Sequence, residues 1–213
     1  MKATGKLVGS LACAAAFVLA VNQVSAANLI LNPGFETGTT ANWLVLNAGT
    51  VTVDGTANGP SAPGTFSAFM QNTLPANNLA LQQSTAVGSA SPGLVNYSFD
   101  LKVDSSLNGG VVFIHFWDIN SSGGVIDAGP GLLGPYFNTG WVTYSGTWTA
   151  PANVNRFTVE FDCTTGAAAG SAESIHVDNV SISQAVIPEP TTVSLVGLGL
   201  LGAILLGRKN RKS

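Results

Sequence analysis

Charged side chains are scarce in this sequence. They make up 9% of its 213 residues, against about 25% in ordinary soluble proteins. Basic side chains are the scarcest, because between the two ends of the chain only Lys102 and Arg156 are basic, against ten of the eleven acidic residues. Proteins that bind nucleic acid carry clustered basic groups for the phosphates. The composition therefore excludes nucleic acid as a partner and is better suited to neutral glycans or calcium.

Cysteine and histidine are also few, with two of each in the chain. Cys13 lies in an N-terminal apolar segment that we expect to be removed, so Cys163 has no partner for an internal disulfide. We expect Cys163 to be a buried small residue at the end of a strand; the alternatives are a free thiol or a bond between two chains. His115 and His176 fall in no metal-binding or nucleophile motif, so we assign each a core or surface role.

The acidic residues lie in no recognisable catalytic motif either. We therefore expect no enzymatic activity. A glycan-active enzyme would need two carboxylates that face each other across a cleft, and it is the least favoured alternative.

The first residues have the three parts of a secretory signal peptide. Lys2 and Lys6 supply the positive region, an apolar stretch runs from Leu7 to Val21, and small residues at 24–26 suit a signal peptidase. We expect residues 1–26 to be a signal peptide that is cut off in the mature protein. The alternative is that the apolar stretch is retained as an N-terminal anchor.

The last residues form a second signal. Pro188, Glu189 and Pro190 are followed by an apolar run at residues 191–207 and a mostly basic tail at residues 208–213. The prolines separate this run from the body, and its length is near the short end of the roughly 17–25 residues that span a membrane. Basic residues stay on the cytoplasmic side. The pattern predicts a single transmembrane helix with the body outside the inner membrane.

Residues 186–213 resemble the PEP-CTERM sorting signal, which has these three parts in this order. The resemblance implies that an exosortase, a membrane cysteine peptidase, cuts near Pro188, Glu189 and Pro190, which are then a processing signal. It also implies that the inner membrane holds the chain through its C-terminal helix before processing, and that the cell surface or extracellular matrix holds it afterwards. The alternative is an ordinary C-terminal anchor.

The sequence pattern of the body, residues 27–185, predicts one all-β domain. Short stretches of alternating apolar and polar residues are separated by Gly, Pro, Asn and Ser, and no long segment has helical periodicity. About nine or ten short strands in a domain of this length fit a jelly-roll β-sandwich. The expected strands are at residues 28–32, 50–54, 66–71, 79–84, 95–103, 111–118, 141–148, 156–162 and 174–183.

The last of these strands breaks its own alternation. Ile175 and Val177 share one parity, whereas Val180 and Ile182 share the other. One extra residue near Asp178 would restore the pattern, which predicts a β-bulge that re-aims the Asp178 side chain.

Three segments of the body resemble jelly-roll carbohydrate-binding modules of the galactose-binding-like group. They are Asn28–Glu36, Gly140–Pro151 and Ile175–Ile182. In those modules an acidic residue of the opening segment and an Asp of the last strand often share a structural calcium ion, which implies Glu36 and Asp178 as ligands here. Calcium is bound by about six to eight oxygens, so loop carbonyls near Gly64 would have to contribute. The alternative is that both acids are solvated or cap turns.

Sugar sites combine aromatic faces with a few polar groups. Trp117, which lies beside Asp118 at a strand end, and Tyr136, in a Gly/Pro-rich loop, are the expected ligand contacts. We therefore expect an exported, exosortase-processed surface or extracellular-matrix protein with a non-catalytic carbohydrate-binding-like module, whose glycan could be an exopolysaccharide. The alternative is a structural biofilm-matrix or adhesion protein with no dedicated sugar site.

Overall fold

The computed structural model describes residues 26–55, 64–104, 109–127 and 129–184. These ranges cover most of the predicted body. The predicted signal peptide before residue 26, the processing residues Pro188, Glu189 and Pro190, the predicted transmembrane helix at 191–207 and the basic tail lie outside them. Within the described ranges, no helix is long and apolar enough to cross a membrane.

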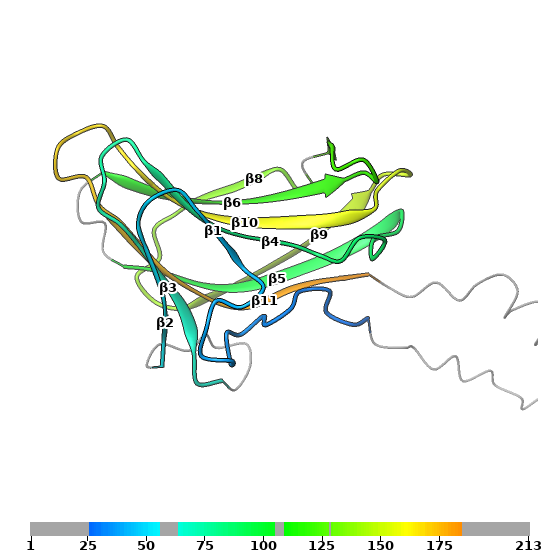
Figure 1. The fold of residues 1–213 in the computed structure, drawn as a ribbon, viewed down its shortest axis with the longest axis horizontal. Helices are drawn as coiled ribbons and strands as arrows, with labels where there is room; N and C mark the ends of the chain where they lie inside the picture. The colour runs from blue at the N-terminus through cyan, green and yellow to red at the C-terminus, as the bar shows by residue number, and fades with distance from the viewer. Residues whose placement is uncertain (1–25, 56–63, 105–108, 128, 185–213) are drawn as a thin grey trace, which may run out of the picture.

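The described residues form two antiparallel sheets that lie one over the other (Figure 1). The six-stranded sheet has the order β1-β4-β10-β6-β7, and β8 also pairs with β6; its strands are β1 (Leu44–Leu46), β4 (Asn78–Ser84), β10 (Arg156–Thr165), β6 (Gly110–Ile119), β7 (Val125–Asp127) and β8 (Leu132–Tyr136). The five-stranded sheet has the order β2-β3-β11-β5-β9; its strands are β2 (Thr50–Asp54), β3 (Ser67–Asn72), β11 (Glu173–Gln184), β5 (Gly93–Val103) and β9 (Val142–Ala150). The predicted all-β sandwich is confirmed.

The hydrophobic core fills the space between the sheets because the strands alternate. Side chains of one parity in β6 and β10 point inward and are fully buried: Val112, Ile114, Phe116, Phe157, Val159, Phe161 and Cys163. The opposite sheet contributes Phe99 and Leu101, also at 0% exposure. Successive side chains of a strand point to opposite faces. The other side chains of β6 and β10 therefore lie on the outer face of the six-stranded sheet.

Cys163 is buried near the end of β10, as predicted. Its thiol donates to the carbonyl oxygen of Glu173 over 3.3 Å. Burial, and then the nearby charge of Glu173, raise the pKa of the thiol to about 12. A thiol held in this way is an inert core group.

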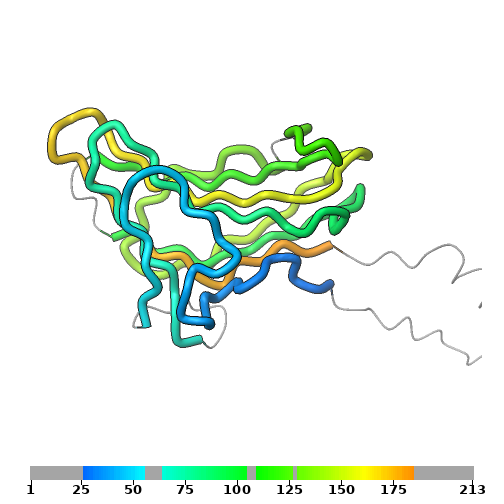
Figure 2. Tube along the Cα trace, viewed as in Figure 1, coloured from blue at the N-terminus to red at the C-terminus, as the bar shows by residue number. Residues whose placement is uncertain are grey.

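The opening segment is not a strand, contrary to the expectation for residues 28–32. It runs beside β11, and Figure 2 shows the two described ends of the chain side by side. Two of its bonds to β11 come from the Asn28 side chain: Nδ2 donates to the Val180 carbonyl (2.9 Å), and Oδ1 accepts from the Ile182 amide (3.1 Å). The backbone contributes a bond from the Leu29 amide to the Ile182 carbonyl (2.8 Å).

The predicted bulge in β11 is confirmed. Asp178 lies opposite Asp100 of β5, and the next paired residue, Ser181, lies opposite Ser98, so β11 carries one residue more than β5 in this interval. Asn179 takes up the difference with a φ of 50°. Asp178 is 1% exposed as a result.

Sequence periodicity did not find β1, β7 and β8. These strands have 3, 3 and 5 residues, which is too short for alternation to be recognised. β7 and β8 pair with two different parts of the same edge of β6. They leave β6 in the interior of the sheet, which agrees with its apolar character on both faces.

Candidate functional site

The outer face of the six-stranded sheet carries polar and aromatic side chains close together. Its outward residues in β4, β10 and β6 include Asn78, Gln82, Ser84, Thr158, Glu160, Asp162, His115 and Trp117. In Figure 1 this sheet lies above the other one, and β10 dips between its two ends, so the outer face is concave. A concave face of this composition is suited to holding a ligand.

Side chains of neighbouring strands bond to one another across this face. The register places Gln82 opposite Glu160 and Ser84 opposite Thr158. Gln82 Nε2 donates to Glu160 Oε2 over 2.5 Å, and the hydroxyls of Ser84 and Thr158 are 2.7 Å apart. These bonds hold the side chains of the face in fixed positions.

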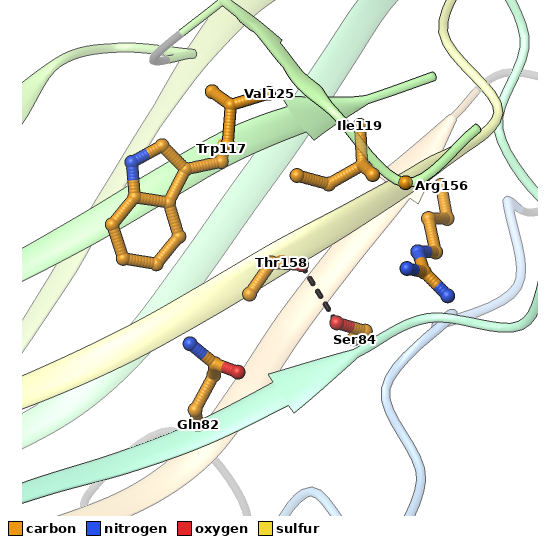
Figure 3. Close-up of a pocket in the computed structure, with 8 residues that line it drawn as sticks. Gln82, Ser84, Trp117, Ile119, Val125, Arg156 and Thr158 are labelled. Atoms are coloured by element: carbon orange, nitrogen blue, oxygen red, sulfur yellow. Dashed lines mark hydrogen bonds between the residues drawn. The ribbon is translucent and has the colours of Figure 1, made fainter. Parts of the chain in front are cut away.

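An open pocket of about 310 Å³ lies toward one end of this face. It is lined by Gln82, Ser84, Trp117, Ile119, Gly123, Val125, Arg156 and Thr158. In Figure 3, Trp117 and Arg156 lie on either side of a floor made by the Ser84–Thr158 hydrogen bond. The arrangement combines an aromatic ring, neutral hydrogen-bonding groups and one positive charge.

Arg156 has no carboxylate partner in the part of the chain that the structure describes. The other basic residue there, Lys102, pairs with Asp104 at 3.2 Å, whereas Arg156 takes part in none of the ion pairs. Its Nε is buried and has no hydrogen-bond partner among the described residues. A guanidinium in this position can donate to hydroxyl or carboxylate oxygens of a ligand.

The structure brings Trp117 to this pocket but not Tyr136. Trp117 is partly exposed on the outer face of β6. Tyr136 lies opposite Val112, on the inner side, and its ring packs on Tyr144 at 4.5 Å and Phe99 at 6.2 Å between centroids. Burial raises the pKa of Tyr136 to about 12. Tyr136 therefore packs against the core, because the pairing of β8 with β6 turns its ring inward.

The two expected calcium ligands, Glu36 and Asp178, both lie close to Gly34. A Cβ atom on Gly34 would lie 3.3 Å from Asp178 Oδ1 and 3.7 Å from Glu36 Cγ. The Glu36 carboxylate accepts the backbone N–H groups of Thr65 (2.8 and 3.0 Å) and Phe66 (3.1 Å). The segment expected to supply carbonyl oxygens thus does reach Glu36. The hydrogen bonds that it makes there are donated by its backbone N–H groups to the Glu36 carboxylate.

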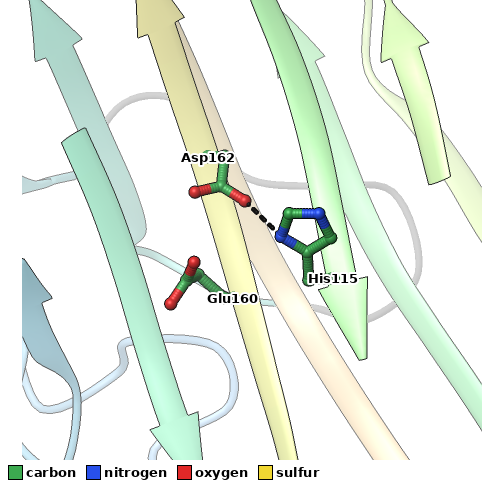
Figure 4. Close-up of side chains that lie close together, drawn as sticks. All are labelled: His115, Glu160 and Asp162. Atoms are coloured by element: carbon green, nitrogen blue, oxygen red, sulfur yellow. Dashed lines mark ion pairs between the residues drawn. The ribbon is translucent and has the colours of Figure 1, made fainter. Parts of the chain in front are cut away.

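A group of ionisable side chains that the sequence analysis did not assemble lies next to Trp117. Among the described residues, His115, Glu160 and Asp162 each offer a ligand-type atom within 4.8 Å of the others (Figure 4). Nδ1 of His115 is 2.8 Å from Oδ2 of Asp162. Burial, and then the charge of Asp162, raise the pKa of Glu160 to about 7. The two-residue spacing of Glu160 and Asp162 in the sequence predicts that they share one face of a strand. His115 lies beside them because of the register in which β10 pairs with β6.

The C-terminal residues match a known family model. Residues 186–212 match the PEP-CTERM protein-sorting motif. This confirms the resemblance seen at that end of the sequence. Comparison of the sequence with curated proteins found no match.

Several solved structures share the fold of the body. The xylan-binding domain CBM22-1 of Xyn10C from Paenibacillus barcinonensis matches with a TM-score of 0.55 and 14% identity, over 76% of this chain and 97% of that one. A family 16 carbohydrate-binding module matches with a TM-score of 0.51 and 15% identity, over 74% and 100%. The enzymatically active domain of tailspike protein 4 from bacteriophage CBA120 matches with a TM-score of 0.59 and 13% identity, over 73% of this chain but 21% of that one.

Identities this low show a common fold and leave the ligand open. The chain thus ends in a PEP-CTERM sorting motif, which implies export and processing by an exosortase, and its body has the jelly-roll fold of carbohydrate-binding modules.

Proposed function

We propose that this protein acts at the cell surface or in the extracellular matrix, where its sandwich binds a carbohydrate between Trp117 and Arg156. One observation carries the proposal: a partly exposed indole borders a floor of fixed hydrogen-bonding side chains on the concave face of this fold. The apolar face of a sugar ring stacks on an indole, and its hydroxyls bond to the polar groups around it.

The pocket has the chemistry for a short stretch of polysaccharide. Its volume of about 310 Å³ is at the lower end of ligand pockets, so it holds one or two sugar rings and leaves the rest of a chain to lie along the open face. Gln82, Ser84 and Thr158 suit neutral hydroxyls. Arg156 can donate hydrogen bonds to a sugar hydroxyl or to the carboxylate of a uronic acid.

The test is a panel of polysaccharides in affinity gel electrophoresis: xylan, a β-glucan, a polyuronate and the exopolysaccharide of the producing cell. We expect retardation by at least one of them, and at least about tenfold weaker binding after Trp117→Ala, because a stacking contact of about 1.4 kcal/mol or more is removed. Trp141→Ala is the matched control, since Trp141 is also partly exposed but contacts His176 of the other sheet. Equal binding by the Trp117→Ala variant would overturn the proposal.

We propose that the module is non-catalytic. The carboxylates of a glycosidase flank the bond that is cut and are about 5–9.5 Å apart. Glu160 and Asp162 both project from one face of β10, so they would lie on the same side of a glycan that rests on the sheet. Release of reducing ends from a polysaccharide of the panel, lost in the Glu160→Gln variant, would contradict this.

A structural matrix or adhesion protein is the second candidate. The observation in its favour is that Gln82, Ser84, Glu160 and Thr158 already satisfy one another by hydrogen bonds. This candidate predicts no retardation by any polysaccharide of the panel together with normal folding of the wild-type protein.

Processing by an exosortase, with Pro188, Glu189 and Pro190 as its signal, completes the proposal. The match over residues 186–212 supports it. Replacing these three residues by Ala should leave a larger form in the membrane fraction, whereas the same change at Thr191 and Thr192 should not. Identical processing of both variants would refute the role of the three residues.

We also propose that Glu36 and Asp178 hold a structural calcium ion. Both side chains come within 4 Å of the Cβ position of Gly34, which supports this, since carboxylate oxygens are the ligands that calcium prefers. Such an ion would join the opening segment to β11 and would have no part in catalysis.

A further inference from the structure

The cluster of His115, Glu160 and Asp162 lies in the middle of the outer face, beside the proposed glycan pocket. His115 comes from β6, and the two acids come from β10, where they are two residues apart and share one face. Figure 4 shows the imidazole and the Asp162 carboxylate turned toward each other, with Glu160 next to them. The ring of His115 also lies 5.1 Å from that of Trp117.

Each carboxylate of the cluster is held in place by an amide from β4. Gln82 Nε2 donates to Oε2 of Glu160 (2.5 Å), and Asn78 Nδ2 donates to Oδ1 of Asp162 (2.7 Å). One oxygen of each carboxylate accepts such a bond, whereas the other oxygen of Asp162, Oδ2, has no hydrogen-bond partner among the described residues. Outer hydrogen bonds of this kind are what orients the ligands of metal sites.

The buried oxygen of Asp162 that faces the cluster lacks a hydrogen bond. Asp162 is 2% exposed, and among the described residues its Oδ2 has no hydrogen-bond partner. Nδ1 of His115 lies 2.8 Å away, within ion-pair distance, and it too has no hydrogen-bond partner among the described residues. A buried carboxylate oxygen without a donor is costly. A cation bound by both atoms would remove that cost.

The charge balance of the cluster also favours a cation. Two buried acids lie together, and within the described residues the neighbouring group that can become positive is His115. In the described part of the chain, neither Lys102 nor Arg156 pairs with Glu160 or Asp162.

We propose that His115, Glu160 and Asp162 bind a divalent transition-metal ion, and Zn²⁺ in particular. An imidazole nitrogen with two carboxylate oxygens is a ligand set of zinc, whereas calcium takes oxygen ligands only. Zinc ligands lie about 2.0–2.2 Å from the ion, so the three atoms, which are within 4.8 Å of one another, need only small side-chain movements. Because the His115 side chain is 32% exposed, the fourth position of the ion faces solvent.

This zinc site is separate from the two sites proposed above. It shares no residue with the calcium ligands Glu36 and Asp178. It adjoins the glycan pocket, but none of its three residues lines that pocket. A metal titration without glycan and a glycan titration with a chelator therefore report on the two sites independently.

The experiment is calorimetric titration of the purified full chain with Zn²⁺, in a non-chelating buffer with a non-thiol reductant and excess Ca²⁺. We expect one zinc ion per chain in the wild type, and at least about tenfold weaker binding in the His115→Gln and Asp162→Asn variants. His176→Gln is the matched control, since the chain has only two histidines; it should bind zinc like the wild type. Unchanged affinity in His115→Gln, or no binding by the folded wild type, would overturn the proposal.

Cobalt provides a second measurement that does not depend on how well the variants fold. Co²⁺ in place of Zn²⁺ should give visible absorption bands of a four- or five-coordinate ion in the wild-type protein. No sulfur-to-cobalt charge-transfer band should appear, because Cys163 is buried on the inner face of β10. The spectrum of free, six-coordinate cobalt would contradict the site.

Discussion

At the scale of single residues, the buried carboxyl of Glu173 makes stability depend on pH. The residue is 0% exposed. Its Oε1 accepts the Ser174 amide over 3.0 Å, whereas Oε2 has no hydrogen-bond partner among the described residues. Burial raises the pKa of Glu173 above its usual value of 4.5. The folded state therefore binds this proton more tightly than the unfolded state does.

The sign of the effect follows from the direction of that shift. The stability contributed by protonated Glu173 is fully present below pH 4.5, the unfolded pKa, and is lost as the pH rises through the higher folded pKa. We expect the melting temperature of Glu173→Gln, relative to that of the wild type, to rise as the pH is raised from 4.5 to 7. Parallel melting curves over this range would show that Glu173 does not titrate differently in the two states.

At the scale of elements, the bulge in β11 is held by one residue with an unusual backbone. Asn179 has a φ of 50°, a conformation that Asn tolerates and β-branched residues do not. Its Nδ2 donates to Asp100 Oδ2 over 2.8 Å, and its backbone amide donates to Asp178 Oδ1 over 2.7 Å. The bulge thus fixes the position of the buried Asp178 side chain.

We expect Asn179→Val to destabilise the domain by about 1–3 kcal/mol, because a β-branched residue is strained at this φ. Asn179→Gly is the matched control: it relieves the strain and loses only the side-chain bond to Asp100, at a cost of about 1 kcal/mol. Urea unfolding of both variants measures the difference. If the Val variant were as stable as the Gly variant, the backbone at Asn179 would not be the constraint.

At the scale of the whole molecule, the opening segment and the last strand must be kept together. Asn28 bonds to β11 through its side chain, and the Val180 amide donates to the Pro33 carbonyl over 3.0 Å. Glu36 and Asp178 both have side-chain atoms near the Cβ position of Gly34 in the same region. A calcium ion there would act as a clamp between the two ends of the domain.

Calcium should therefore stabilise the whole domain. A ligand that binds only the folded state at about one hundred times its dissociation constant adds about 2.7 kcal/mol. We expect thermal unfolding of the wild type to move to higher temperature with Ca²⁺ and to return with a chelator. Glu36→Gln should lose this response, and Glu160→Gln, at the proposed zinc site, should keep it. If calcium does not change the unfolding midpoint of the wild type, the calcium site is refuted. The glycan proposal would then depend on Trp117 alone.

The parts of the fold that follow from local pattern were predictable. Alternation located the long strands β5, β6, β10 and β11 to within a few residues of their ends, because a period of two is a property of one segment alone. The opening segment was predicted wrongly as a strand. It has the composition of a strand, but the Asn28 side chain makes two of its hydrogen bonds to β11, and periodicity in the sequence cannot show bonds of this kind.

The candidate site was predictable only in part. Trp117 was identified as an exposed aromatic at a strand end and does line the pocket. Tyr136 was identified as an aromatic residue in a Gly/Pro-rich loop, yet the pairing of β8 with β6 turns it toward Phe99 and Tyr144. Arg156 was noted as a rare base without a role. Its position across the floor from Trp117 depends on the β10–β6 register.

The sequence by itself determined the sorting motif at residues 186–212, the all-β class and the bulge in β11, because each depends on contiguous residues. The tertiary structure alone decided which side chains meet. His115 and Asp162 come together because β6 and β10 pair in one register, and that register is selected by the burial of Val112, Ile114 and Phe116 against the opposite sheet. A shift by one residue would turn every outward side chain inward, so the outer face exists only once the core has formed.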